Sequence, residues 1–144
     1  MTTASQITIA LNEARAQLID AIETATGLST GNDKSLFVDN FPPSYNTAAL
    51  FIGGGSDVIP WQGDNPPVAL NMDFRIEARF ILHSDAWAFA VSVMGAFPIK
   101  ADRITVARPT AVPTVEGKYF KYDASDPQLL FAVDIPGLLV FSIG

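Results

Sequence analysis

A long run of alternating residues constrains the fold of this chain more than any other feature. From position 68 to 83 the even positions are apolar, and most of the odd positions carry charged or polar side chains. A period of two predicts a β-strand with one face on the core. The run is longer than the usual strand of about five or six residues, so we expect part of it to project as a hairpin arm.

Helical periodicity precedes and follows this strand. An amphipathic helix is predicted from about Gln6 to Thr26, with its apolar stripe on the core. The stripe consists of Ile7, Leu11, Ala14, Leu18, Ile22 and Ala25. Ser84 is expected to cap a second helix that Pro98 ends, and this helix is so apolar that we expect it to be buried, at least partly, against the sheet. Its predicted periodic positions are Trp87, Ala90, Val91, Met94 and Phe97.

Shorter strands are expected in the remaining segments. The candidates are residues 36–41, 48–52, 103–112, 117–123, 129–135 and the apolar end at 138–143. One helix, several strands, a second helix and further strands indicate an α+β fold. We expect an antiparallel or mixed sheet with two helices packed on one face and an extended β-hairpin or loop arm. A length of 144 residues predicts a single domain over 1–144.

Charge and composition exclude several classes of function. The net charge of −6 and the scatter of the nine basic residues argue against specific binding to nucleic acid or to an anionic membrane. No segment reaches the roughly 18 apolar residues of a membrane span, and the first twenty residues lack the pattern of a signal peptide. The chain has no cysteine, so disulfides and thiolate chemistry are absent.

Residues with catalytic chemistry do not form a recognisable motif. His83 is the single histidine, and a Ser84 next to it in sequence is in the wrong place to act as its nucleophile. Gly53–Gly55 lacks the lysine and the following helix of a phosphate loop. We therefore predict no catalytic residue, no metal site, no cofactor and no enzymatic activity.

The charged face of the long strand is predicted to form ion pairs. Asp73 and Glu77 alternate with Arg75 and Arg79, and arginines beside them hold carboxylates ionised, which does not suit a general acid. We expect an ion ladder that forms either across strands or between subunits.

Two further features are candidates for assembly contacts. Trp61 lies in the proline-rich segment 57–67, where it either contacts a partner or packs as a lid on the protein's own core. Leu139 and Phe141 belong to an apolar C-terminus that must be buried in its own sheet or in a neighbour's.

Several of these elements together resemble one family. The amphipathic first helix, the proline-punctuated segment after it, Phe-Arg-Ile-Glu-Ala-Arg-Phe at 74–80 and the helix opening Ser-Asp-Ala-Trp are similar to the tail terminator and neck proteins of tailed phages. The resemblance implies a homo-oligomeric ring, usually a hexamer, that caps the tail tube and meets the head connector. It also implies that DNA passes through without specific binding, and that the protein resides in the virion after assembly from the host cytoplasm.

Other functions remain open from the sequence. The alternatives are another head–tail or tail-tube subunit of a phage and an adaptor of a contractile injection system. A different class is a small monomeric α+β ligand-binding domain or enzyme with a site near Trp61 and His83.

Overall fold

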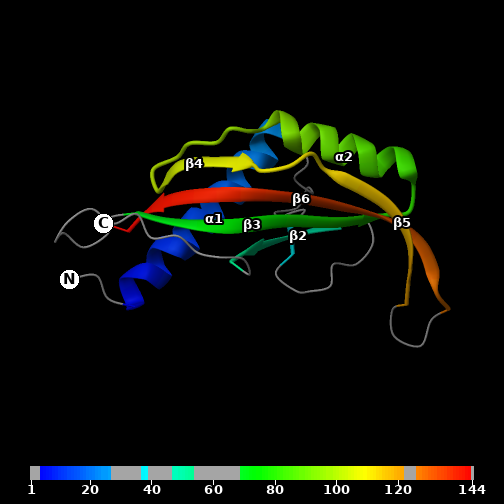
Figure 1. Ribbon diagram of the computed structural model, residues 1–144, viewed down its shortest axis with the longest axis horizontal. Helices are drawn as coiled ribbons and strands as arrows, with labels where there is room; N and C mark the ends of the chain where they lie inside the picture. Colours follow the sequence, from blue (N-terminus) through cyan, green and yellow to red (C-terminus); the bar gives the residue numbers. More distant parts are fainter. Residues whose placement is uncertain (1–3, 27–36, 39–46, 54–68, 122–125, 144) are drawn as a thin grey trace.

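The computed structural model describes residues 4–26, 37–38, 47–53, 69–121 and 126–143 (Figure 1). Their fold is α+β, as the sequence predicts. The elements are α1 (Ala4–Thr26), β1 (Phe37–Val38), β2 (Thr47–Ile52), β3 (Ala69–Phe80), α2 (His83–Gly95), β4 (Ile104–Pro109), β5 (Thr114–Phe120) and β6 (Gln128–Ser142). Trp61 and the segment 57–67 lie outside the described residues.

The strands form one mixed sheet in the order β1-β2-β3-β6-β4, with β5 also paired to β6. The β1–β2 pair is parallel and the other pairs are antiparallel. The charged alternating strand is therefore an inner strand, held on one edge by β2 and on the other by β6.

The projecting arm is not the element that the sequence suggested. All 12 residues of β3 pair with β6, from Ala69 opposite Ser142 to Phe80 opposite Phe131. The arm is instead the hairpin of β5 and the start of β6, where Leu130 still pairs with Lys118 beyond the end of β3. Figure 1 shows this hairpin bending away from the rest of the sheet. The expectation was wrong because a long strand need not project when an equally long neighbour accompanies it.

The last strand is continuous through a proline. Two strands were expected on either side of Pro136, but β6 runs for 15 residues. β5 pairs with β6 up to Asp134 and β4 pairs from Gly137 onward, so Pro136 falls at the junction between these two partners. There its carbonyl accepts a hydrogen bond from the Thr110 N–H at 3.0 Å. The missing N–H of proline therefore costs the sheet no ladder hydrogen bond.

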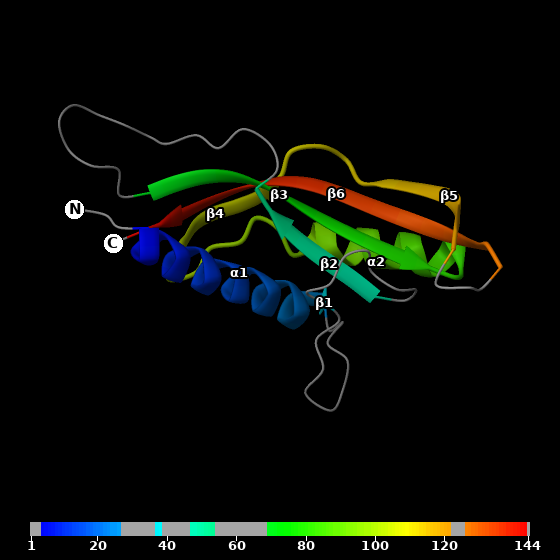
Figure 2. The same ribbon diagram turned by 90° about the horizontal axis from the view of Figure 1, so that it is seen from below.

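The core lies between one face of the sheet and both helices. Side chains at even positions of β3 and odd positions of β6 share this face and belong to one buried cluster with residues from both helices. Figure 2 shows α1 running along this side of the sheet. The fully buried positions of α1 are Ala10, Ala14, Leu18 and Ile22. Ile7 and Leu11 of the predicted stripe are half-buried at its edge, and Ala25 is exposed.

A glycine in β6 is required by an aromatic ring. Gly137 is directly opposite Phe74 on the core face, and a Cβ atom at position 137 would lie only 2.0 Å from Phe74 Cζ. The ring is held in turn by Phe97, with which it stacks at a centroid distance of 5.8 Å. An aromatic ring thus covers the strand where a side chain is missing.

The second helix turns a different face to the core than its sequence indicated. It begins at His83, and the residue before it, Leu82, makes no side-chain capping bond, so Ser84 is not the N-cap. The buried positions are Ala86, Phe89, Ala90 and Val93. Trp87 is 42% exposed and Val91 is 66% exposed. The prediction was wrong because α2 is apolar on every side, so periodicity does not identify the inner face.

Arg103 ties the first helix to the end of the last strand. Its Nε lies 2.8 Å from Glu13 Oε2 and its backbone N–H donates to Gln17 Oε1 at 2.9 Å. Its Nη1 donates to the carbonyls of Ile143 at 3.1 Å and Ser142 at 3.4 Å. A guanidinium with five donors can serve both partners at once, so Arg103 fixes α1 against β6.

Candidate functional site

The charged ladder predicted from the sequence lies on the open face of the sheet, opposite the helices. Arg75 Nε is 3.2 Å from Asp134 Oδ1, and Arg75 Nη1 is 3.5 Å from Glu77 Oε1. Glu77 and Asp134 are directly opposite each other in β3 and β6, and like charges in that position repel. Arg75 therefore compensates a carboxylate pair. The contact with Asp134 is electrostatic, because no donor reaches Oδ1 with hydrogen-bond geometry.

The end of the ladder contacts the hairpin arm. The guanidinium of Arg79 lies over the ring of Phe120 in β5, with 3.8 Å from Cζ to the ring centroid. Such a cation–π contact contributes about 0.5–1 kcal/mol where it is exposed. At the other end, the backbone carbonyl of Asp73 accepts a hydrogen bond from the Gly53 N–H at 2.7 Å. Among the described residues, Arg75 pairs across strands within one chain.

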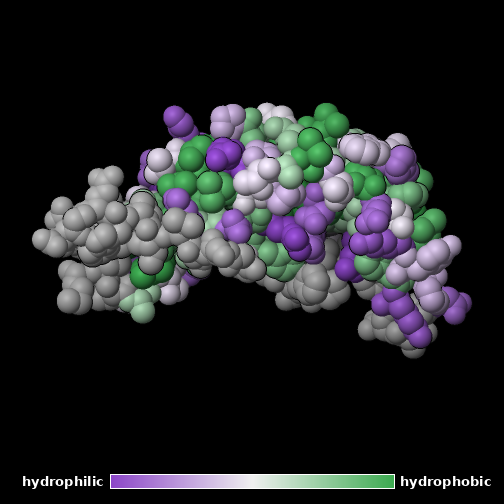
Figure 3. Space-filling model, in the orientation of Figure 1, coloured by the Kyte–Doolittle hydropathy of each residue, from purple (hydrophilic) through white to green (hydrophobic). Residues whose placement is uncertain are grey.

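Apolar side chains flank this ladder. Leu138 and Val140 of β6 and Val106 of β4 are half-buried, and their pairing partners place them on the open face. Figure 3 views the molecule from this side, with polar residues near the middle and hydrophobic residues over the β4–β6 end. The open face therefore offers both charge and apolar area to a partner.

A second exposed surface lies on the helix side, where the arm meets the start of α2. We call it the aromatic surface, and it consists of Leu82, His83, Trp87, Tyr119, Leu129 and Phe131. Tyr119 is 73% exposed and is directly opposite Leu129, which is 43% exposed. Large apolar side chains are thus grouped on one surface instead of scattered, which marks interaction sites.

Ring contacts connect Trp87, His83 and Phe131 within the aromatic surface. The His83 ring lies 5.0 Å from the Phe131 ring, centroid to centroid, and 6.5 Å from that of Trp87. The indole N–H of Trp87 donates to His83 Nε2 at 3.1 Å. That nitrogen is therefore already an acceptor, and His83 contributes to packing on this surface.

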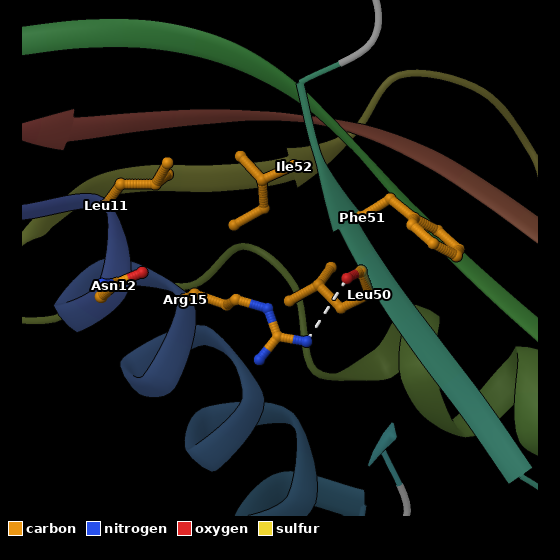
Figure 4. A pocket seen from close by; sticks show the side chains of 6 residues that line it. All are labelled: Leu11, Asn12, Arg15, Leu50, Phe51 and Ile52. Carbon is orange, nitrogen blue, oxygen red and sulfur yellow. Dashed lines mark hydrogen bonds between the residues drawn. The ribbon is translucent and has the colours of Figure 1, made fainter. Parts of the chain in front are cut away.

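Among the described residues, two hollows open to solvent. One, of about 530 Å³, lies between α1 and β2 (Figure 4). Leu11 and Ile52 line its apolar side, and the Arg15 guanidinium points at β2, donating to the Leu50 carbonyl at 3.4 Å. The other, also of about 530 Å³, lies at the C-terminal end of α2, and we call it the α2–β4 hollow. It is lined by Met94, Phe97, Pro98, Arg108, Pro109, Thr110, Ala111 and Val112.

The structure changes the set of candidate contact residues. Leu139 and Phe141 are 0% exposed in the chain's own core, so they are not available to a partner. The apolar C-terminus is therefore buried in its own sheet and not in a neighbour's. Sequence analysis missed Tyr119 and Leu129, although an aromatic residue between lysines in a short strand was a usable signal. It assigned Trp87 to the core because that residue fits a helical period.

Comparison with known proteins gives no match, either to a family model or to a curated protein. Within the described ranges, no group of three or more His, Cys, Asp or Glu side chains is placed to hold a metal ion. In the same residues, neither helix is long and apolar enough to cross a membrane.

Proposed function

We propose that this chain is a structural subunit of a phage tail, which assembles into a homo-oligomeric ring at the neck, caps the tail tube and joins it to the head connector. The observation that carries the proposal is the aromatic surface. Trp87, Tyr119 and Leu129 expose large apolar side chains on three elements, α2, β5 and β6. Trp and Tyr supply most of the binding energy at many protein interfaces, so this surface suits permanent contact with another protein.

The shape of the subunit supports a role in assembly. The β5–β6 arm extends beyond β3 and carries Tyr119 away from the core. A ring subunit that also meets a tube and a connector needs several separate contact surfaces. The aromatic surface and the open face lie on opposite sides of the sheet, which provides two of them.

The charge of the chain is compatible with a channel for DNA. A net charge of −6 does not attract phosphate. We propose that DNA passes through the ring without specific binding, that the protein resides in the virion and that it has no enzymatic activity.

The second candidate is a monomeric ligand-binding domain, which the hollow between α1 and β2 favours. Its volume of about 530 Å³ falls in the range of small-molecule pockets. However, few polar groups converge there, and Arg15 already bonds to the Leu50 carbonyl. Asn12 and Arg15 supply the polar side chains of its lining among the described residues, and two such groups give a small molecule little orientation, so assembly remains the better supported function.

The test is the solution mass of the purified protein, measured by light scattering over a concentration series, with negative-stain images of any large species. A discrete closed ring, near six times the 15.4 kDa chain mass, is the expected result. The same series is repeated in the presence of tubes assembled from a phage tail tube protein. A strict monomer that also fails to bind the tube ends would refute the proposed function.

A further inference from the structure

We infer that two free copies of this chain pair through the outer edges of β5, antiparallel and about a two-fold axis at Gly117. β5 has seven residues and pairs with β6 along one edge. Among the described residues, no strand pairs with its other edge. Such an edge is a template for a strand of another chain. The contact goes beyond the proposed function, because it concerns the free subunit and does not build the ring.

The edges of β2 and β4 are partly covered, whereas the outer edge of β5 is not. At β4, Ile99 and Ala107 exchange two backbone hydrogen bonds, of 3.0 and 2.9 Å. At β2, the short strand β1 covers residues 48–49. The seven residues of β5 include no proline, and their one glutamate and one lysine balance in charge. β5 therefore lacks two common devices that keep another strand away from an edge, a proline and an excess of charge.

The charges of β5 are complementary to themselves in one register. Directly opposite residues of an antiparallel pair share a face, so a two-fold pairing is centred on a residue. A centre at Gly117, the midpoint of β5, pairs all seven residues and places Glu116 opposite Lys118 of the second copy, twice. A centre at Glu116 or at Lys118 would instead place two like charges opposite each other. Charge thus selects the register centred on Gly117.

Both charged side chains are accessible to a second copy. Glu116 Oε2 lies 3.2 Å from Lys118 Nζ, and the two side chains are 69% and 55% exposed. Neither has another ion pair within the described ranges. An exposed pair of this kind contributes little by itself. In the dimer, four charges of alternating sign would form a network across the two strands, which gives the pair a larger role in choosing a partner.

The other face of β5 is complementary in the same register. Tyr119, which is 73% exposed, would be opposite Val115 of the second copy, and Val115 packs at the edge of the core. An aromatic residue opposite a β-branched one stabilises a strand pair. At the centre two glycines would face each other, and glycine in a strand is typical of a close approach by another backbone. Both faces therefore fit a second copy of β5.

Charge exchange in β5 tests the pairing. Glu116→Lys and Lys118→Glu should each weaken the dimer about tenfold or more, because each change puts like charges opposite each other at two positions. A mixture of the two variants should form a one-to-one dimer, since two lysines of one chain then face two glutamates of the other. The variant with both exchanges should dimerise as the wild type does. Sedimentation over a concentration series measures these masses.

Two controls keep this test specific. Lys100→Glu and Asp102→Lys make the same changes of charge at exposed positions outside β5, and both should dimerise as the wild type does. Glu116 and Lys118 are exposed, so the fold should persist in their variants, which circular dichroism and thermal melting check.

Hydrogen exchange locates the contact independently of charge. Dimerisation should slow exchange at alternate amides of β5, those whose N–H groups lie on the outer edge, because they gain hydrogen bonds to the second copy. The amides of β3, which is paired on both edges within the chain, should not change. Equal exchange of the β5 amides in the wild type and in Lys118→Glu would overturn the contact.

The outcomes separate this contact from the proposed function. If the wild type forms no dimer, if either single variant dimerises as well as the wild type, or if the mixture stays monomeric, the β5 contact is wrong. Rings that form equally in the wild type and in both variants, without dimers, also refute it but leave the ring subunit standing. Dimers that follow the charge pattern, without rings even in the presence of tubes, support the contact and refute the proposed function.

Discussion

The Phe74–Gly137 contact gives the sharpest prediction about stability. In Gly137→Ala, the new Cβ would lie 2.0 to 2.5 Å from three atoms of the Phe74 ring. The ring cannot swing away, because it is buried and stacked on Phe97. The backbone φ of Gly137 lies outside the left-handed region that Gly53 occupies (φ 91°), so the cost is steric. Overpacking of this kind costs about 1–3 kcal/mol, and we expect the upper half of that range.

The assay is urea unfolding followed by circular dichroism, with the free energy of unfolding compared at equal slope. Gly95→Ala is the matched control, because a Cβ there meets nothing within 4 Å, and it should be neutral or stabilise by up to about 1 kcal/mol, since alanine favours the helix. Phe74→Leu alone should cost about 1–2 kcal/mol by leaving a cavity. In the double variant the Cβ occupies that cavity, so the combined loss should fall short of the sum by about 1 kcal/mol. Additive losses, or a neutral Gly137→Ala, would refute this account.

Four further substitutions concern contacts between the elements, and the effect of each is measured as a change in the free energy of unfolding. Arg103→Met should cost about 2–3 kcal/mol, because it removes charge-assisted hydrogen bonds to α1 and to the end of β6. Glu13→Gln should cost under about 1 kcal/mol and lose its effect in high salt, because the Glu13 side chain is half exposed. Leu18→Ala should cost about 2–5 kcal/mol because its side chain is fully buried. Phe120→Leu should cost under about 1 kcal/mol. It should cost less in a background where Arg79 is already replaced by Met, because the cation–π contact is then absent.

The parts of the fold that were predictable are the elements with one buried face and one solvent-exposed face. In β3 this contrast produces strict alternation, and the buried residues from Phe74 to Phe80 follow it. In α1 it produces spacings of three and four, and Leu18 and Ile22 are buried accordingly. Ala25 was predicted to be part of the buried stripe but is exposed, because it lies in the last turn of α1, beyond the edge of the core. Patterning therefore identified element type and inner face together.

The parts that were not predictable depend on a partner within the sheet. Nothing local shows that β6 accompanies β3 for 12 residues, so the length of β3 was attributed to an arm. Nothing local shows that Pro136 falls between β4 and β5, so it was expected to end a strand. The arm itself is defined by where β3 stops, at Phe80, which is a property of a different segment.

The wrong prediction for α2 bears directly on function. A helix that is apolar all round is ordinarily buried all round. Here the sheet covers only the side of Phe89 and Val93, and leaves Trp87 and Val91 exposed. Because apolar residues lie on every side of α2, its periodicity did not identify the inner face. For the same reason a second apolar face of α2 stays exposed among the described residues. Exposed tryptophan and valine on a rigid helix favour association in water, so the property that defeated the structural prediction is also the one that supports an assembling subunit.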